Sequence, residues 1–306
     1  MNHRRQLIIS SLLLAIACGL AFAPDAYMPM LARAFTLWWA IGFGAMALAV
    51  LRKRWWWASC SSALASAMLL PVLHMPGPAM IEATGSPDLR IAHLNVLQPN
   101  ARHADVLTAI RHADADLVSV QEVSPQWAVA LRDGLGEEYR YQLVTPRTNC
   151  YGIALFSRIP LRKARVIVLS GAPFIEAEVE AVGGALRVYI AHATSPGSPS
   201  QFFRRNAQLR ALAKLIADGS LPTVLIGDLN TVHWDDAYQQ LCANSGLLPL
   251  NHSRMATWPS IGPLAFIPLD HALVRGPIRA STIDSFKIPG SDHRGLLASL
   301  HFAHAP

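Results

Sequence analysis

The stretch that decides the fold is "PTVLIGDLN", residues 222–230. Its apolar run, which follows a proline and a threonine, predicts a buried strand. A Gly-Asp-Leu-Asn segment ends the run and places Asp228 and Asn230 at the end of that strand. Taken alone, two such polar residues are explained by an ordinary turn. Their meaning depends on whether other strands end in the same way.

Other predicted strands do end in the same way. We predict strands at 89–97, 115–123, 186–194 and 269–274, and a Pro-Gly turn in "PGSDHRG" (289–295) ahead of a last strand at 296–302. Polar residues lie at or near the ends of these segments: Asn95, Glu122, His192, Asp270, Asp292 and His293. Burying such groups unpaired costs about 2–7 kcal/mol each. One shared site explains this pattern better than six unrelated turns.

Amphipathic helices alternate with the strands. Residues 104–113 and 200–219 have apolar residues at helical spacing, and the second stretch closes at Gly219. Residues 151–157 read as a further strand, and 174–182 alternate apolar residues with Glu, as a half-exposed strand does. Strands and helices mixed within one domain predict an α/β or α+β layered fold.

The N-terminal region has a different composition. Residues 7–23, 35–51 and 55–73 are apolar runs close to the minimum for crossing a hydrocarbon core about 30 Å thick. We therefore predict three transmembrane helices and a membrane anchor over residues 1–73. A Pro-rich linker (74–87) separates the anchor from a catalytic domain at 88–306.

The cations around these runs predict the orientation. Arg4 and Arg5 precede the first run, and Arg52, Lys53 and Arg54 separate the second from the third. Positive charge favours the cytoplasmic side, so the N-terminus is expected inside an inner or plasma membrane. The catalytic domain is then expected to be periplasmic or extracellular. The alternative is a signal peptide cleaved after "AFA" (21–23); Pro24 argues against cleavage, and cleavage would leave the side of the domain unchanged.

The net charge of +6 is not a nucleic-acid signal once it is divided along the chain. Residues 1–87 hold six Lys or Arg against two acidic residues, whereas residues 88–306 hold 20 against 18. Most of the excess therefore marks membrane topology rather than a basic face. Cys150 and Cys242 are far apart in sequence, so a disulfide between them is an open question, and no cysteine spacing indicates zinc.

The polar residues suit metal-assisted phosphoryl chemistry. Asn95, Glu122 and Asp292 offer hard oxygen ligands, which favour Mg²⁺ or Mn²⁺. His293 could take a proton from an attacking water if Asp270 fixes its tautomer. Asn230 and His192 could donate to phosphate oxygens as charge develops.

The ordered set "LNV", "QEV", "AHAT", "GDLN", "LDHALV" and "GSDHRG" resembles the endonuclease/exonuclease/phosphatase superfamily over residues 89–302. That group includes deoxyribonuclease I, abasic-site endonucleases, neutral sphingomyelinases and inositol-polyphosphate phosphatases. "TWP" and "PLDHALV" (257–274), with the apolar start, are further similar to a membrane-anchored bacterial branch. The resemblance implies a four-layered α/β sandwich, in which two packed mixed sheets are flanked by helices.

The resemblance also implies a role for each matched residue. Glu122 matches the principal metal ligand, with Asn95 and Asp292 beside it, and His293 matches the catalytic histidine, paired with Asp270. Asp228 matches the residue that positions or activates water, and Asn230 matches the amide that contacts phosphate. His192 occupies a position that is His in deoxyribonuclease I and sphingomyelinases but Tyr in abasic-site enzymes, which counts against abasic-site repair.

We therefore expect a membrane-anchored phosphodiesterase that requires Mg²⁺ or Mn²⁺ and acts on a lipid or nucleic-acid phosphoester by in-line attack of water. The anchor is expected to contact membrane lipid, and no sequence feature indicates a protein partner. Two alternatives stay open: a nuclease acting on extracytoplasmic DNA or RNA, and a catalytically silent binding module. His93 is interpreted as structural, and His271 as pointing away from Asp270 because strand side chains alternate.

Overall fold

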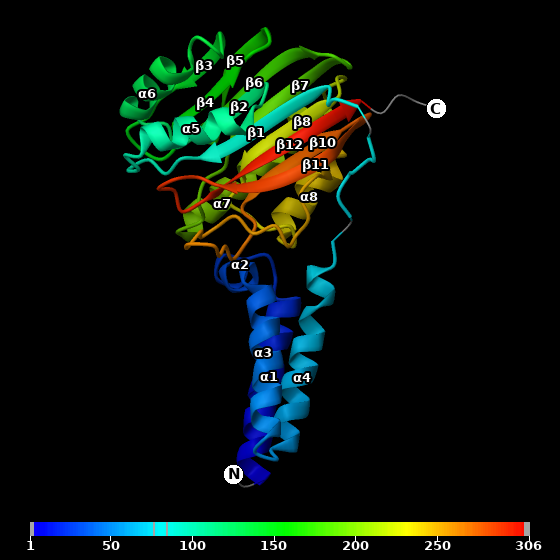
Figure 1. Cartoon of the computed structure of the whole chain (residues 1–306). Coiled ribbons are helices and arrows are strands. Elements are labelled where there is room, and N and C mark those ends of the chain that lie inside the picture. The colour runs from blue at the N-terminus through cyan, green and yellow to red at the C-terminus, as the bar shows by residue number, and fades with distance from the viewer. Residues whose placement is uncertain (1–2, 76, 84, 303–306) are drawn as a thin grey trace. The chain divides into compact units, whose positions relative to one another are not determined.

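The computed structural model describes residues 3–75, 77–83 and 85–302. The chain divides into two compact units. One comprises Met1–Pro76 with Val232–Asp236, and the other comprises Gly77–Thr231 with Ala237–Pro306. Figure 1 shows the helices of the first unit in blue to cyan and the strands and helices of the second unit in cyan to red.

The first unit is built from apolar helices: α1 (His3–Phe22), α2 (Tyr27–Ala34), α3 (Thr36–Leu51), α4 (Trp56–Leu69) and the 3₁₀ turn η1 (Pro71–Leu73). Small side chains such as Ala17, Ala40 and Ala65 pack at its centre and let the helices approach closely. The outward faces are apolar too, with Leu12 59% and Leu48 69% exposed. Apolar surface of this kind on single-chain helices is typical of segments that lie in lipid.

Two or three of these helices can span a membrane, against the three that the sequence predicts. Within the described residues, His3–Phe22 and Trp56–Leu73 pass by length and hydropathy. α3 has 16 residues and is about 24 Å long, short of a core about 30 Å thick. It meets α2 at 61°, and the two helices give a third span only if the bent pair crosses as one.

The second unit contains two six-stranded sheets. The first has the order β11-β12-β1-β2-β4-β3, and the second β5-β6-β7-β8-β10-β9. The first sheet comprises β1 (Leu89–Asn95), β2 (Leu117–Gln121), β3 (Tyr141–Thr145), β4 (Ile153–Ser157), β11 (Ile278–Lys287) and β12 (Arg294–Phe302). The second comprises β5 (Leu161–Leu169), β6 (Ala172–Ala181), β7 (Gly184–His192), β8 (Thr223–Asp228), β9 (Leu248–Pro249) and β10 (Asp270–Arg275).

Three apolar layers confirm the four-layered α/β sandwich. The central layer lies between the sheets and joins Ile91 and Leu155 of the first to Val188 and Ile226 of the second. The outer face of the first sheet packs against α5 (His103–Ala113) and α6 (Pro125–Leu135), and that of the second against α7 (Pro199–Ala217) and α8 (Asp236–Ser245). Figure 1 shows α5 and α6 on the side of the first sheet and α7 and α8 on that of the second.

The apolar alternation of the sequence produces these layers, because every second strand residue faces the same way. The predicted helices at 104–113 and 200–219 are α5 and α7, and Ser198 caps α7 by accepting a hydrogen bond from the Gln201 amide. The strands predicted from the sequence are present. All four cysteines are free, including Cys150 and Cys242.

Candidate active site

The polar residues meet at one edge, where strands of both sheets end. β1 runs parallel to β2, with Asn95 opposite Gln121, and β7 runs parallel to β8, with His192 opposite Asp228. Parallel strands bring their carboxyl ends to the same edge. Asp270 instead lies at the amino end of β10, and it reaches that edge because β10 is antiparallel to β8 and pairs Asp270 with Asp228.

Gly227 and Gln121 join the two sheets behind the site. Gly227 has a φ of +152°, and a Cβ there would overlap the Ala191 carbonyl and the Gln121 amide. The Gln121 side chain donates to the Ala191 carbonyl and accepts from the Asp228 backbone N–H at 3.0 Å. The glycine of "GDLN" is therefore required by close backbone approach. Gln121, which the sequence analysis did not select, holds the strand that carries Asp228.

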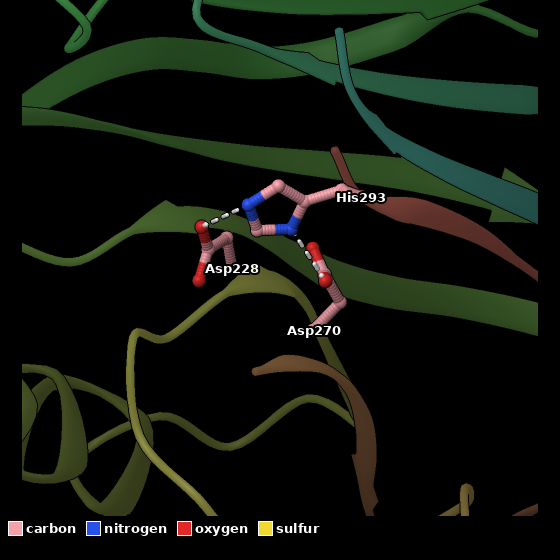
Figure 2. Close-up of side chains that lie close together, drawn as sticks. All are labelled: Asp228, Asp270 and His293. Carbon is pink, nitrogen blue, oxygen red and sulfur yellow. Dashed lines mark hydrogen bonds and ion pairs between the residues drawn. The ribbon is translucent and has the colours of Figure 1, made fainter. Parts of the chain in front are cut away.

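The centre of the site is an imidazole between two carboxylates. His293 Nδ1 lies 2.8 Å from Asp270 Oδ2, and its Nε2 lies 3.8 Å from Asp228 Oδ2. Figure 2 shows the ring of His293 between these two side chains. All three residues are buried. Since a carboxylate accepts, Nδ1 carries a proton and donates it to Asp270, which leaves Nε2 to exchange protons on the side of Asp228.

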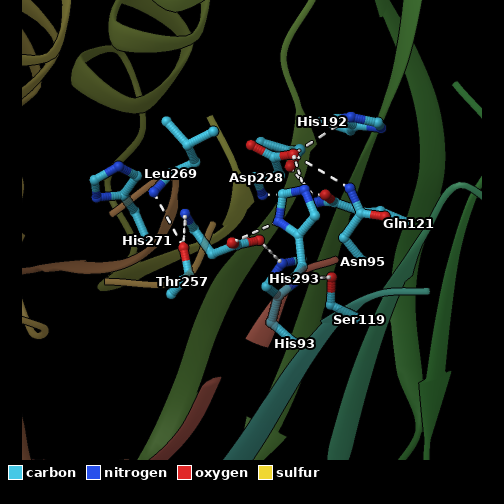
Figure 3. A network of polar contacts seen from close by, with 12 residues as sticks. His93, Asn95, Ser119, Gln121, His192, Asp228, Thr257, Leu269, His271 and His293 are labelled. Atoms are coloured by element: carbon cyan, nitrogen blue, oxygen red, sulfur yellow. Dashed lines mark hydrogen bonds and ion pairs between the residues drawn. The ribbon is translucent and has the colours of Figure 1, made fainter. Parts of the chain in front are cut away.

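A second histidine contacts the same aspartate, and the interpretation of His93 as purely structural missed this contact. His93 Nε2 lies 2.8 Å from Asp270 Oδ1, and its Nδ1 lies 3.3 Å from Ser119 Oγ. Figure 3 shows His93, Ser119 and His293 around this point. The signal was present in "HLN", because His93 and Asn95 are two residues apart and face the same side of β1.

The predicted metal ligands divide into a pair and a neighbour. Asn95 Nδ2 donates to Glu122 Oε1 at 3.1 Å and to Asp228 Oδ2 at 3.2 Å. Glu122 Oε2 also accepts the Gln98 backbone N–H at 2.9 Å. Asp292 Oδ2 accepts from the Trp258 indole at 2.9 Å, whereas its Oδ1 is shielded from solvent and accepts no hydrogen bond from the residues that the structure describes. Ser291 Oγ, which donates to the Asn95 carbonyl at 2.7 Å, ties the Asp292 loop to β1.

Burial and neighbouring charges shift the pKa values of the central groups in opposite directions. Burial, reinforced by Asp270, raises the pKa of Asp228. Burial would also raise the pKa of Asp270, but the charge and hydrogen bonds of His293, together with His93, outweigh it and hold that pKa below its usual range. Burial lowers the pKa of His293, yet Asp270 and Asp228 outweigh burial and raise it to about 10.

The two predicted phosphate-contacting residues line the same edge. The Asn230 backbone N–H donates to Asp228 Oδ1 at 2.8 Å, and its side chain donates to the Ala193 carbonyl at 3.0 Å. Asn230 has a φ of +49°, and the buried Arg205 donates to its carbonyl at 3.0 Å. His192 Nε2 lies 3.7 Å from Asp228 Oδ2. Burial lowers the pKa of His192 to about 3, so its imidazole is uncharged at neutral pH.

Three further residues of interest lie near the site: Thr257, Trp258 and His271. Thr257 Oγ1 accepts the Asp270 backbone N–H at 3.1 Å, so it packs beside the site, as does Trp258. His271 points away from the carboxylates, as predicted from strand alternation, and its Nε2 lies 2.8 Å from the Thr231 carbonyl. Glu122 and Asn230 both have positive φ values, of 64° and 49°, and backbone strain of this kind concentrates at functional sites.

The donor set fits a hard divalent cation. Asp228, Asp270 and His293 bring a ligand atom each to within 4.8 Å of one another. The carboxylate oxygens of Glu122 and the unpartnered Oδ1 of Asp292 add ligands of the type that Mg²⁺ and Mn²⁺ prefer. A cation would also offset the crowding of negative charge that raises the pKa of Asp228.

Several solved structures share this fold. A humanised D. rerio TDP2 superposes with a TM-score of 0.58 and 17% identity, covering 70% of this chain and 98% of that chain. An endonuclease/exonuclease/phosphatase from Bacteroides vulgatus gives 0.59 and 18%, with coverages of 70% and 98%. A mannosyl-6-phosphatase from Bacteroides thetaiotaomicron gives 0.58 and 16%, with coverages of 70% and 100%. At these identities the likeness shows the fold alone.

No curated protein matches the chain. The model of the Endonuclease/Exonuclease/phosphatase family matches residues 92–293, which is more than half of the chain and spans every predicted site residue. Together with the two-sheet architecture, this match confirms the resemblance found in the sequence. The chain belongs to the endonuclease/exonuclease/phosphatase family.

Proposed function

We propose that the chain is a membrane-anchored, divalent-metal-dependent phosphoesterase that hydrolyses phosphodiesters by in-line attack of water. The observation that carries the proposal is the position of His293. Its Nδ1 is fixed by Asp270 at 2.8 Å, and its Nε2 faces the edge where Asp228, Asn95 and Glu122 meet. An oriented imidazole beside several oxygen ligands is the combination that water-activating phosphoesterases require.

Glu122, Asn95 and Asp292 would hold the cation, which when bound polarises the phosphoryl oxygen and neutralises charge on the leaving group. Mg²⁺ and Mn²⁺ both suit this oxygen-rich set. The hydrogen bonds from Asn95 and from the Gln98 backbone N–H hold the Glu122 carboxylate in place.

The chain's own residues would handle the proton and the phosphate. Asp270 holds Nδ1 of His293 as the donor, so that Nε2 faces the attacking water. Nε2 would receive the proton of that water once a bound cation offsets the carboxylate charges that raise the pKa of His293. Asp228 lies beside that nitrogen and would orient the same water. The Asn230 amide would contact the phosphate. His192, which burial keeps uncharged, would donate a hydrogen bond rather than supply a positive charge.

The apolar N-terminal helices support the location. We propose that residues 1–73 anchor the enzyme in an inner or plasma membrane with the N-terminus in the cytoplasm, and that the linker 74–87 presents the catalytic domain 88–306 outside the cytoplasm. This assignment rests on the Arg4–Arg5 and Arg52–Arg54 clusters. Reporter fusions after residue 87 and within the Arg52–Arg54 turn test it, and reporters active on the same side would contradict it.

The near balance of 20 cations and 18 anions in residues 88–306 favours a membrane-derived phosphodiester over nucleic acid. The test uses the full chain in detergent micelles with Mg²⁺. Hydrolysis of bis-p-nitrophenyl phosphate, of phospholipid vesicles and of single-stranded DNA is compared with that of p-nitrophenyl phosphate, the monoester. We expect the two non-nucleotide diesters to be cleaved faster than the monoester.

Three results would change this proposal. Cleavage of the monoester alone would replace the diesterase with a phosphatase. Cleavage of DNA with a steep decrease at raised salt would replace the lipid-directed diesterase with a nuclease. Turnover of no substrate, combined with retained Mg²⁺ binding, would identify a silent binding module.

A further inference from the structure

The carboxylate of Asp270 is held between two histidines from different parts of the fold. His293 follows β11 and contacts Oδ2, whereas His93 lies within β1 and contacts Oδ1, both at 2.8 Å. His93, Asp270 and Ser119 are 0% exposed. The hydrogen bond from His93 therefore crosses from the first sheet to the second, between residues 177 positions apart.

This bond determines how the carboxylate is turned. The backbone of Asp270 is already fixed, since its N–H donates to Thr257 Oγ1 at 3.1 Å and its carbonyl accepts from Asn251 Nδ2 at 3.2 Å. The side chain can still rotate about its last bond, because that torsion is soft. A donor on Oδ1 and another on Oδ2 fix the plane of the carboxylate.

Ser119 in turn fixes His93. Its hydroxyl can donate to or accept from His93 Nδ1, so the Nε2–H of His93 points at Asp270 whether or not Nδ1 also carries a proton. Without His93, the completely buried Oδ1 would lose the donor that the structure provides. A carboxylate left with one donor can turn toward a new partner, and the ring of His293 would turn with it.

We propose that His93 is a positioning residue, which orients Asp270 and through it keeps Nε2 of His293 aimed at the attacking water. The inference rests on the proposed function, because it assigns a role in the same reaction. It adds a residue that touches neither substrate nor cation. The arrangement makes the active edge a chain of four side chains, from Ser119 through His93 and Asp270 to His293.

Two variants separate positioning from mere structural support. The Gln side chain places an amide donor near the position of the histidine Nε2, whereas the shorter Asn reaches only the position of Nδ1. His93→Gln should therefore keep the bond to Asp270, and His93→Asn should lose it. His271→Gln is the matched control, because His271 is also 0% exposed and hydrogen-bonded but faces Thr231.

The measurement is hydrolysis of bis-p-nitrophenyl phosphate by the full chain in detergent with Mg²⁺, together with the melting temperature. We expect His93→Asn to lower kcat about 10- to 100-fold, as part of the general-base contribution, with KM changed less than about twofold. His93→Gln should recover kcat to within a few-fold, and His271→Gln should leave kcat unchanged at a similar loss of melting temperature. Equal losses in the Asn and Gln variants, or an unchanged kcat in His93→Asn, would overturn the proposal.

A second readout does not depend on turnover. In the full chain labelled with ¹⁵N-histidine, the ring N–H signals report the hydrogen bonds of each histidine, and those of His293 are assigned from their loss in His293→Ala. The Nδ1–H signal of His293 should show a strong hydrogen bond in the native chain and in His93→Gln, and a weaker one in His93→Asn, whether or not Nε2 also carries a proton. If the native chain hydrolyses no phosphoester, the proposed function fails while these spectra still decide the positioning role; identical His293 signals in all variants would overturn it.

Discussion

The two ends of the two-sheet sandwich each carry a cluster of polar side chains, and the clusters are built in opposite ways. Near the start of β1 and β2, Asp114 accepts from Arg158 at 2.7 Å and from Arg90 at 3.1 Å. Arg158 also pairs with Glu138. At the other end, Asp228 and Asp270 are buried, and their ion pairs among the described residues are with histidines.

The difference appears in the pKa values. Hydrogen bonding and charge from Arg158 hold the pKa of the exposed Asp114 below its usual value. Burial and the charge of Asp270 raise the pKa of Asp228. The first cluster pairs its carboxylates with arginines and serves stability, whereas the second sets the buried carboxylates of Asp228 and Asp270 around His293 and is suited to receive further positive charge from a cation. Perturbed, incomplete clusters of this kind mark functional sites.

The largest contrast should come from removing the imidazole. We expect His293→Ala to lower kcat by about 10²- to 10⁴-fold, because it removes the imidazole that is proposed to accept the proton from water. Arg158→Ala, at the opposite end, should lower the melting temperature and leave kcat unchanged. Both are measured with bis-p-nitrophenyl phosphate and Mg²⁺. A comparable decrease of kcat in Arg158→Ala would remove the functional distinction between the two ends.

Acid should lower the free energy of unfolding through His271, a buried histidine that is uncharged in the folded chain. Burial lowers the pKa of His271 from 6.5 to about 4, so the unfolded state takes up a proton first as the pH falls. Between pH 6.5 and about 4, the free energy of unfolding should therefore fall by about 1.4 kcal/mol per pH unit because of this residue. Below the folded pKa this loss levels off.

Hydrogen exchange of the β10 amides in the full chain measures this pH dependence. His271→Gln should reduce the slope, and His112→Gln, which removes an exposed histidine on α5, should not. An unchanged slope in His271→Gln would show that the ring is not held uncharged.

The stabilisation of the chain by the cation should depend on residues at the active-site end and not on those at the opposite end. We expect Mg²⁺ at about 100 times its Kd to add about 2.7 kcal/mol to the free energy of unfolding of the native chain. Glu122→Gln should lose most of this gain, whereas Glu138→Gln at the opposite end should keep it. Melting temperatures with Mg²⁺ or with chelator give the comparison. An equal gain in Glu122→Gln would place the cation elsewhere.

The smallest effects should differ in sign. Asp114→Asn should cost no more than about 1 kcal/mol, because exposed ion pairs contribute little. Asp228→Asn should instead raise the stability of the cation-free chain by about 1 kcal/mol at neutral and higher pH. The raised pKa of Asp228 means that the native chain loses stability as the pH rises above 3.8 toward the folded pKa, and Asn has no proton to lose. Hydrogen exchange of the β8 amides measures the stability of both variants. A loss of stability in Asp228→Asn as well as in Asp114→Asn would contradict the account.

The sequence predicted the layered fold because apolar strands ending in polar residues follow directly from the period of a strand. The structure brings Asn95 and Glu122 together, and Asp270 and His293 together, as the strand-end pattern predicted. The predicted strand at 269–274 has Asp270 at its amino end, and the sequence did not reveal that this end reaches the site, because the direction of a strand depends on its partners.

The contacts missed by sequence reasoning are those that cross between the sheets. His93 reaches Asp270 across 177 positions, and Gln121 reaches Asp228 across 107. Each lies in an apolar strand where a buried polar residue reads as a local exception. The sequence did carry a signal for each: His93 shares a strand face with Asn95, and Gln121 directly precedes Glu122. The bend between α2 and α3 was also missed, since an apolar run does not reveal where a helix breaks.

The central claim is that the crowded carboxylates and His293 form a metal-dependent hydrolytic centre. The most direct measurement strips the full chain of metal and follows bis-p-nitrophenyl phosphate hydrolysis in chelator, after return of Mg²⁺ or Mn²⁺, and in Glu122→Gln under the same conditions. The account predicts no turnover in chelator, recovery with either cation, and no recovery in Glu122→Gln. Full turnover in chelator, or full recovery in Glu122→Gln, would contradict it.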